Sequence, residues 1–327
     1  MSSAVSFGLL SLVELVVAIT LNAGIIIIHM KGLRCCSKLP PVDIIHVAMG
    51  LVNISLATFL LGHFLGMSLS TFYPQISFHV TIIPLPFLMY FTFWLTAWLC
   101  AYYCTGINTS SHRLISWMKT CLRTSMPHLL VFSGLGSLAI SLPAFWILHF
   151  KLQGQYSENG TFLGTSVGIG SQSIVYSFVG NLLGCFLPFI VILVSLLTSV
   201  SSLVRHIWKI KQSDQESKRP KLRSHINALR TMVLLLILSG MFYTAETMLF
   251  NISSMEDNRI VASWSLIIIF PTAEAIIMIQ ASRNLRKIFL GAICPSKLVN
   301  NIVDLKNLEC GISTDPNLLN PSTHKEH

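Results

Sequence analysis

The chain has 327 residues, of which 53% are hydrophobic and only 11% are charged, and its formal net charge is +9. A soluble globular domain is typically about 25% charged, so this composition excludes a soluble protein and requires that lipid surround much of the chain. The mean hydropathy of +0.67 agrees. The sequence therefore indicates an integral membrane protein, and the positions of its basic residues predict its orientation.

A helix that crosses a bilayer needs about 20 apolar residues, and the chain offers a series of such runs. In chain order they are residues 7–30, 42–67, 81–106, 127–149, 173–204, 229–250 and 261–281. The first run lacks a basic leader and a cleavage site, so we expect it to be retained as a span. We predict an all-α membrane protein, a bundle of seven transmembrane helices within residues 1–295. Residues 296–327 are polar and predict a mobile cytoplasmic tail.

Basic residues are distributed very unevenly between the two sides of this predicted bundle. With the N-terminus outside, all of the 22 Lys and Arg residues fall on the inner side except Lys151 and Arg259. Because cytoplasmic loops carry the excess of Lys and Arg, this predicts an extracellular N-terminus and a cytoplasmic C-terminus. The glycosylation sequons agree, since Asn159 lies in the outer loop between spans four and five. Asn251 begins a second outer sequon, close to the bilayer.

Seven spans with a basic inner face are typical of a G-protein-coupled receptor. A transporter often shows repeated halves, and no internal repeat is visible here. An enzyme would need a catalytic motif, but neither HExxH nor GxSxG occurs, and we predict no enzymatic activity, no cofactor and no metal. A retinal receptor would need a lysine in span seven, and residues 261–281 contain none.

Motifs in five spans give the chain a resemblance to the taste receptor type 2 family, the bitter taste receptors. Span one reads E-x-x-x-A-x-x-x-N from Glu14 to Asn22, span three contains Trp94 and Tyr103 in register, and span six opens with H-x-x-A-L-R from His225 to Arg230. Span five has Pro188-Phe189 and S-L-x-x-H, and span seven keeps Pro271. The loop from about 150 to 172 has no Cys to staple it to span three, as in that family. The mammalian type 1 vomeronasal receptors are related in pattern.

The resemblance implies a ligand site in the outer half of the bundle, with Trp94 facing the ligand. Trp98 lies one helical turn away on the same face, although a lipid-interface aromatic belt is an alternative for both tryptophans. Glu246 is the main polar candidate for this ligand site, because ionisable groups in spans usually face the bundle interior or water. It either faces the site, where it could pair with a cationic ligand, or is solvated at the outer interface. The other candidates for this site are aromatic: Tyr90, Phe242, Tyr243 and Trp264.

The chain departs from the family at positions that hold the bundle together. The His-Ser that follows the span-seven proline is Glu274-Ala275 here, and the span-two Arg is Asn53. Polar groups in hydrocarbon are costly unless they are hydrogen-bonded, so we expect Glu14, Asn22, Asp43 and Glu274 to bond between helices. The structural or switching positions are then Glu14, Asn22, Asn53, Tyr103, Pro188, Pro271 and Glu274. His29, His46 and His63 have no metal-like partners at fixed spacing.

The basic segment of residues 209–225 could in isolation be a nucleic-acid arm or a nuclear localisation signal. Apolar spans flank it on both sides, so we interpret it as the third inner loop, where its charges meet anionic lipid, and predict no nucleic-acid partner. We expect the chain to turn at Arg219-Pro220 and the helical flanks to contact the G protein. By resemblance, the G-protein contacts are His112, His206, Lys209, His225, Arg230 and Arg286.

The sequence therefore predicts a multi-pass plasma-membrane receptor for small bitter molecules. Ligand binding shifts the population of helix arrangements, and the inner ends of the spans engage a heterotrimeric G protein, by resemblance gustducin or another of the inhibitory class. A vomeronasal or pheromone-type receptor is the alternative, and a seven-span transporter is a third. After span seven, Arg283 to Lys287 predicts a short helix on the inner surface, followed by Cys294, which is either palmitoylated or simply buried.

Overall fold

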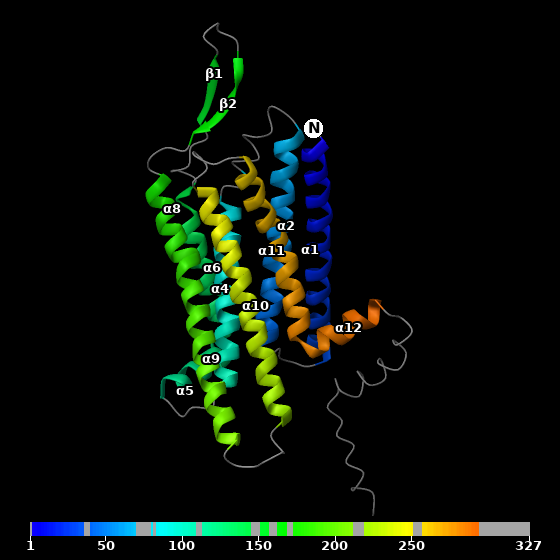
Figure 1. Ribbon diagram of the computed structural model, residues 1–327, viewed down its shortest axis with the longest axis vertical. Coiled ribbons are helices and arrows are strands. Elements are labelled where there is room, and N and C mark those ends of the chain that lie inside the picture. The colour runs from blue at the N-terminus through cyan, green and yellow to red at the C-terminus, as the bar shows by residue number, and fades with distance from the viewer. Residues whose placement is uncertain are drawn as a thin grey trace, which may run out of the picture.

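The computed structural model shows an elongated bundle of long helices (Figure 1). It describes residues 2–35, 40–69, 80, 83–108, 113–144, 151–156, 162–168, 173–211, 219–250 and 257–293. The predicted tail, His112 and Asn159 lie outside these residues. The predicted helical bundle is confirmed. We call the end that carries the basic loops the inner end and the opposite end the outer end; the orientation of the bundle in the membrane stays a prediction.

The first four predicted spans correspond to α1 (Ser2–Cys35), α2 (Pro41–Leu69), α4 (Pro84–Ile107) and α6 (Met126–Ser141). Within the described residues, six helices are long and apolar enough to cross a membrane, and α6, with 16 residues, is a shorter seventh. Many large apolar side chains are exposed on the bundle, and Phe132 on α6 is the most open of them at 75%. Since lipid solvates such surfaces, exposure of this kind is expected on the rim of a membrane bundle.

Helix α4 is the central element of the bundle, because it packs against α2, α6, α9 and α10. It is buried along nearly its whole length, including Tyr90, Phe93 and Leu99. No charged residue occurs between Pro84 and Ile107. This helix therefore presents its side chains to neighbouring helices on almost every face, which makes it the element around which the site is built.

The fifth span is broken into three parts: α8 (Ser173–Asn181), the π-helical turn η1 (Leu182–Phe186) and α9 (Leu187–Lys211). Pro188 explains the break, because a proline ring clashes with the carbonyl one turn earlier and offers no N–H. Inserting one π turn ahead of the proline relieves that conflict while the chain stays helical. Pro188, a predicted switching position, is thus the second residue of α9, just beyond a local widening of the helix.

Helices α10 (Arg219–Phe250) and α11 (Asp257–Ala281) form the sixth and seventh spans. Helix α10 begins ten residues before the predicted span at 229, so the expected turn at Arg219-Pro220 is wrong. Proline is tolerated in the first turn of a helix, where its missing N–H costs nothing. The basic residues that follow Pro220 therefore extend α10 beyond the apolar span.

Two amphipathic helices lie at the inner end: α5 (Arg113–Thr124) and α12 (Arg283–Ile293). The latter confirms the short helix expected after span seven, and Figure 1 shows it turning sideways past the inner end of α1 and pointing away from the bundle axis. Phe289 of α12 packs against Gly24 of α1, where an added Cβ would lie 2.7 Å from the ring. Phe289 and the buried Leu285 therefore hold α12 on the bundle, while Leu290 of the same helix is 59% exposed.

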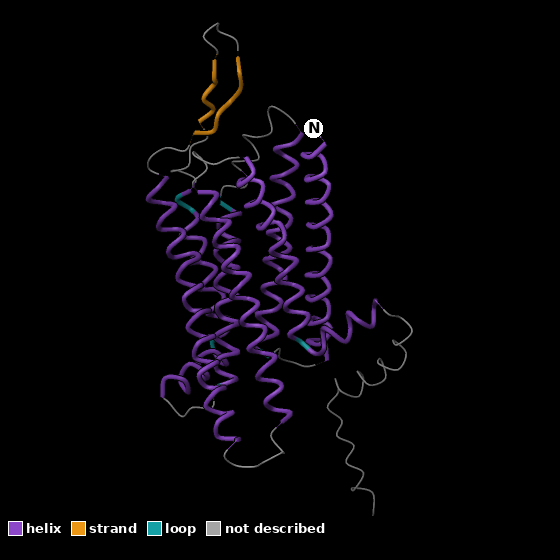
Figure 2. The backbone as a smooth tube through the Cα atoms, viewed as in Figure 1, coloured by secondary structure: helices purple, strands orange, loops and turns teal. Residues whose placement is uncertain are grey.

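The all-helical prediction misses one hairpin in the outer loop between α6 and α8. Strand β1 (Lys151–Tyr156) pairs antiparallel with β2 (Phe162–Gly168), Lys151 opposite Gly168, and the register shifts between Gln155 and Tyr156. Figure 2 shows these two strands extending beyond the helical ends. Short strands of mixed polarity give too weak a pattern to be told from a loop.

Candidate functional site

Glu246 points into the bundle and is only 3% exposed. The Cys185 thiol of η1 donates a hydrogen bond to its Oε2 over 2.6 Å. The alternative in which Glu246 is solvated at the outer interface is therefore excluded by its burial. A carboxyl at this depth is costly unless it is paired, and a thiol is a weak donor.

Tyr90 of α4 packs against the same stretch of the fifth span. It is fully buried, and its ring lies so close to Gly184 and Gly180 that neither position has room for a side chain. At Gly180 an added Cβ would lie 2.7 Å from the Tyr90 hydroxyl oxygen. The two glycines thus allow α4 to approach the helix segment that holds Cys185, next to Glu246.

An aromatic stack continues inward from this position. The ring of Phe242 lies 5.4 Å from that of Phe93 and 4.3 Å from that of Phe270, measured between centroids. Its sequence neighbour Tyr243 points elsewhere and stacks on Phe189 of α9 at 6.2 Å. Of these two predicted ligand residues, Phe242 therefore faces the centre of the bundle, and Tyr243 faces the fifth span.

The remaining predicted ligand residues lie in two separate places. Trp94 and Trp98 are neighbours, with centroids 6.1 Å apart, and the Trp98 indole N–H donates to Ser133 Oγ of α6 over 2.8 Å. Trp264 of α11 stacks on His63 of α2, with centroids 5.4 Å apart. The structure thus brings Tyr90 and Glu246 to the fifth span, with Phe242 one turn inward on α10, and places the tryptophans on the α6 and α2 sides.

A polar network joins four helices in the middle of the bundle. Glu274 of α11 accepts from Thr96 Oγ1 of α4 over 2.7 Å and from Asn53 Nδ2 of α2 over 2.8 Å. Asn53 Nδ2 also donates to Asn22 Oδ1 of α1, and Asn22 Nδ2 reaches the Pro271 carbonyl oxygen over 3.3 Å. The expected bonding between helices is thus found for Asn22 and Glu274, while Glu14 is half-buried and its carbonyl oxygen accepts from Thr272.

The two departures from the family pattern meet inside this network. Asn53 and Glu274 stand where the resembled pattern has Arg and His, and here they are hydrogen-bonded to each other. The Asn53 amide N–H groups and the Glu274 carboxyl are thereby hydrogen-bonded in a water-poor interior, while Asn53 Oδ1 has no hydrogen-bond partner among the described residues. The substituted positions therefore form a contact of their own between α2 and α11.

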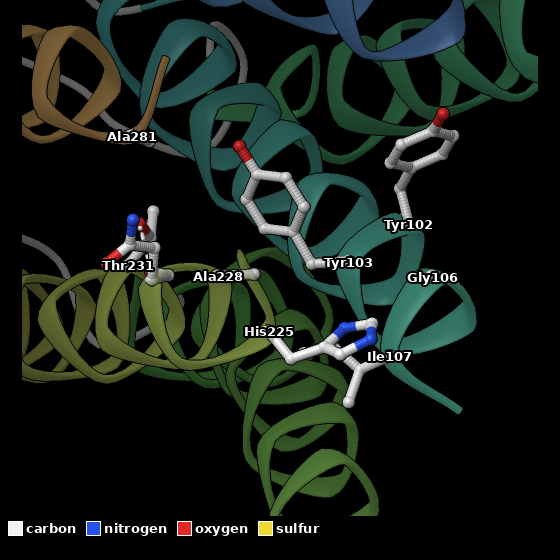
Figure 3. Close-up of a pocket in the computed structure, with 9 residues that line it drawn as sticks. Tyr102, Tyr103, Gly106, Ile107, His225, Ala228, Thr231 and Ala281 are labelled. Atoms are coloured by element: carbon white, nitrogen blue, oxygen red, sulfur yellow. Dashed lines mark hydrogen bonds between the residues drawn. The ribbon is translucent and has the colours of Figure 1, made fainter. Parts of the chain in front are cut away.

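A cavity of about 370 Å³ opens at the inner end between α4, α10 and α11 (Figure 3). It brings together the predicted switching residue Tyr103 and the predicted G-protein contact His225. Figure 3 shows the His225 ring reaching from α10 toward Ile107 of α4, with the Tyr103 ring nearby and its hydroxyl pointing away from His225. The other lining residues are Tyr102, Gly106, Ile107, Asn227, Ala228, Thr231 and Ala281.

The other predicted G-protein contacts are placed only in part. Arg230 on α10 and Arg286 on α12 are exposed at the inner end. His206 and Lys209 belong to the inner part of α9, but their side chains lie outside the described residues. These contacts therefore stay predictions, with Arg230 and Arg286 available to a partner.

Several hydrogen-bond partners of the predicted residues could not be identified from the sequence. Cys185, Thr96 and Ser133 carry no motif, and each matters only because another helix places a polar group within reach. The sequence shows no metal-like partners of the histidines at fixed spacing, but the fold brings His29 and His46 beside Asp43. Cys100 and Cys104 are buried free thiols, which suits packing.

Comparison with known proteins adds evidence from the whole chain. The family model described as taste receptor protein (TAS2R) matches residues 1–297. Human taste receptor type 2 member 9 is 23% identical over 284 residues, which cover 85% of this chain and 89% of that protein. Taste receptor type 2 member 1 of Chlorocebus aethiops is 24% identical over 303 residues, 90% of this chain and 98% of that protein. Taste receptor type 2 member 40 of Gallus gallus is 22% identical over 233 residues, covering 70% and 75%.

Proposed function

The chain belongs to the taste receptor type 2 family, and we propose that it is a bitter taste receptor that binds small molecules in the outer half of its bundle and activates a heterotrimeric G protein. As a member of this family it is a multi-pass plasma-membrane receptor, not a member of an enzyme family. The ligand class, the site and the G-protein class are the proposed parts.

The burial of Glu246 carries the proposal for the ligand site. Ligand sites are mostly apolar and contain a few convergent polar groups, and the surroundings of Glu246 have that composition. Its carboxyl, 3% exposed, accepts a hydrogen bond from Cys185, and Tyr90 and Phe242 pack nearby. A cationic amine on an apolar or aromatic scaffold would pair with the carboxyl and stack on the rings. We therefore propose amines as one agonist class.

The aromatic stack supports a route from this site toward the middle of the bundle. Phe242 follows Glu246 by one turn inward on α10, and its ring contacts Phe270, the residue before Pro271 of α11. Glu274 lies one turn further and holds α2 and α4 through Asn53 and Thr96. A ligand that binds one arrangement of α10 and α11 better than another would shift the population of this network.

At the inner end, the cavity beside Tyr103 and His225 supports G-protein engagement. It is bounded by α4, α10 and α11, and exposed Arg230 lies on α10 a little more than one turn beyond His225. Movement of α10 against α4 would change the width of this cavity, which is how ligand binding would reach the partner. We propose the α subunit of gustducin or another inhibitory-class G protein as that partner.

Calcium release in cells that co-express a promiscuous G-protein α subunit tests the proposal. A panel of amine and neutral bitter compounds should give concentration-dependent signals with the receptor and none in mock-transfected cells. Responses to pheromone-class compounds alone would favour the vomeronasal alternative. Uptake of a compound without any G-protein signal, at normal surface expression, would favour a transporter.

A further inference from the structure

Two histidines and an aspartate meet at the inner end, where α1 ends and α2 begins. His29 comes from α1, and Asp43 and His46 come from α2. One ligand atom from each lies within 4.8 Å of the others, and His29 Nδ1 is 3.6 Å from Asp43 Oδ1. The imidazole rings of His29 and His46 are 5.4 Å apart between centroids. None of these contacts takes part in the ligand site or the inner cavity.

An ion pair between His29 and Asp43 does not account for this cluster. It occupies one nitrogen of His29 and leaves Nε2, together with both nitrogens of His46, buried and without a hydrogen-bond partner among the described residues. His46 is only 2% exposed and His29 only 9%. Buried polar atoms are almost always satisfied, and neither nitrogen of His46 is, so the His46 imidazole points to a ligand that one of its nitrogens would bind.

The donor set selects the class of ligand. Two imidazoles and one carboxylate suit Zn²⁺, which takes nitrogen and oxygen ligands in a tetrahedron and completes it with water. Mg²⁺ and Ca²⁺ prefer oxygen ligands and fit poorly. The inner end is basic, so general attraction of cations does not favour binding, and the ion must be held by direct coordination. We propose that His29, Asp43 and His46 form a Zn²⁺ site that fastens the inner end of α1 to α2.

The geometry is close to what such a site needs. Ligand atoms about 2.0–2.2 Å from zinc stand roughly 3.4 Å apart in a tetrahedron. The 3.6 Å between His29 and Asp43 already fits, and we expect a rotation of the His46 ring to close the remaining distance. Asp43 is the most open of the three, with its side chain 28% exposed, so the ion and its water reach the site from that side.

Metal binding to the full-length receptor tests this site. The protein is purified in detergent through a tag without histidines, stripped with EDTA, and titrated with ZnCl₂ against a chromophoric chelator. We expect one saturable equivalent, a tetrahedral visible spectrum with Co²⁺, and a zinc-dependent rise in the apparent melting temperature. His46→Ala should weaken the affinity at least tenfold and abolish both other signals.

Matched variants separate this site from other histidines and from misfolding. His63→Ala changes another histidine of α2, which stacks on Trp264 far from the cluster, and should leave the zinc affinity unchanged. Asp43→Asn keeps the shape of a half-buried side chain and carries the test if His46→Ala fails to fold. The proposal is overturned if the wild type shows no saturable zinc binding, or if the equivalent persists in both His46→Ala and Asp43→Asn.

Discussion

Two glutamates are buried among the residues that the structure describes, and their surroundings differ. Glu274 accepts hydrogen bonds from an amide and a hydroxyl on two other helices, at 2.8 and 2.7 Å. Glu246 accepts one bond from the Cys185 thiol at 2.6 Å, and the neighbouring side chains are aromatic. Both are at most 3% exposed, so burial does not distinguish them.

The difference lies in how much of each carboxyl the protein itself satisfies. A carboxyl that is fully hydrogen-bonded by its neighbours fixes their positions, and its removal leaves the buried donors without an acceptor. A carboxyl with one weak donor retains the capacity to accept a stronger one. We infer that Glu274 serves the architecture of the bundle and that Glu246 serves an incoming cation, and the predictions below test this comparison.

The largest effect is expected at Glu274. Glu274→Leu removes two hydrogen bonds and leaves an Asn53 amide N–H without its acceptor, so we expect a loss of about 3 kcal/mol in the free energy of unfolding. Thr96 loses less, because its hydroxyl also reaches the Thr92 carbonyl oxygen. The apparent melting temperature of the solubilised receptor and its surface expression measure the loss.

Glu246→Leu is the matched control for that experiment. It removes an equally buried glutamate but leaves only the Cys185 thiol without an acceptor, and the hydrogen bond of a thiol is weak. Its melting temperature should therefore stay well above that of Glu274→Leu. Equal losses in the two variants would contradict the division between an architectural and a ligand-directed carboxyl.

The second effect concerns ligand potency. Glu246→Gln keeps the shape of the side chain but removes its ability to pair with a cation as a charge. We expect amine agonists to lose about 10- to 100-fold in potency, equivalent to about 1.4–2.8 kcal/mol, while neutral agonists keep theirs. Calcium responses across both compound classes measure it. A parallel loss for amines and neutral compounds would instead assign Glu246 to the packing of the bundle.

These contacts also mark what the sequence alone could predict. The helices were predictable because an apolar run of about 20 residues is a strong signal, and the match is close for α2, α4 and α11. The start of α10 was missed because its first residues are basic, and nothing in the residue pattern separates a helix that leaves the membrane from a loop.

The site was only partly predictable for a different reason. Composition identifies polar residues in spans, but their partners depend on helix rotation and on residues far away in sequence. Asn53 and Glu274 are 221 positions apart, and Cys185 and Glu246 are 61 apart. The residue pattern leaves both a buried and a solvated Glu246 open, and the packing of α10 against the fifth span buries it.

A third prediction concerns α8 and η1, the segment that holds Cys185, and tests whether packing against Tyr90 fixes its position. Gly180→Ala places a Cβ 2.7 Å from the Tyr90 hydroxyl oxygen, and such overpacking costs about 1–3 kcal/mol. Tyr90→Phe removes that oxygen, and the nearest ring carbon is then 3.4 Å away, an ordinary contact. The hydroxyl has no hydrogen-bond partner among the described residues, so its removal alone should cost little.

The double variant Gly180→Ala/Tyr90→Phe should therefore recover most of the stability that Gly180→Ala loses, which a double-mutant cycle on the melting temperature measures. Additive losses would mean that Tyr90 does not set the position of this segment. In that case, some contact other than the one with Tyr90 would hold Cys185 next to Glu246. The outer site would then be less rigid than the mid-bundle network.

The smallest loss of stability is expected for Trp98→Phe, and it gives a scale for the larger losses. Trp98→Phe removes the indole N–H that donates to Ser133 Oγ, a single neutral bond between α4 and α6. Interhelical bonds of this kind contribute about 0.6 kcal/mol on average in membrane bundles. Ser133→Ala should cost a similar amount, and the two changes together should cost little more than either alone. Because this bond is worth so little, a Glu274→Leu loss no larger than that of Trp98→Phe would show that the mid-bundle network holds the helices no more firmly than an isolated contact.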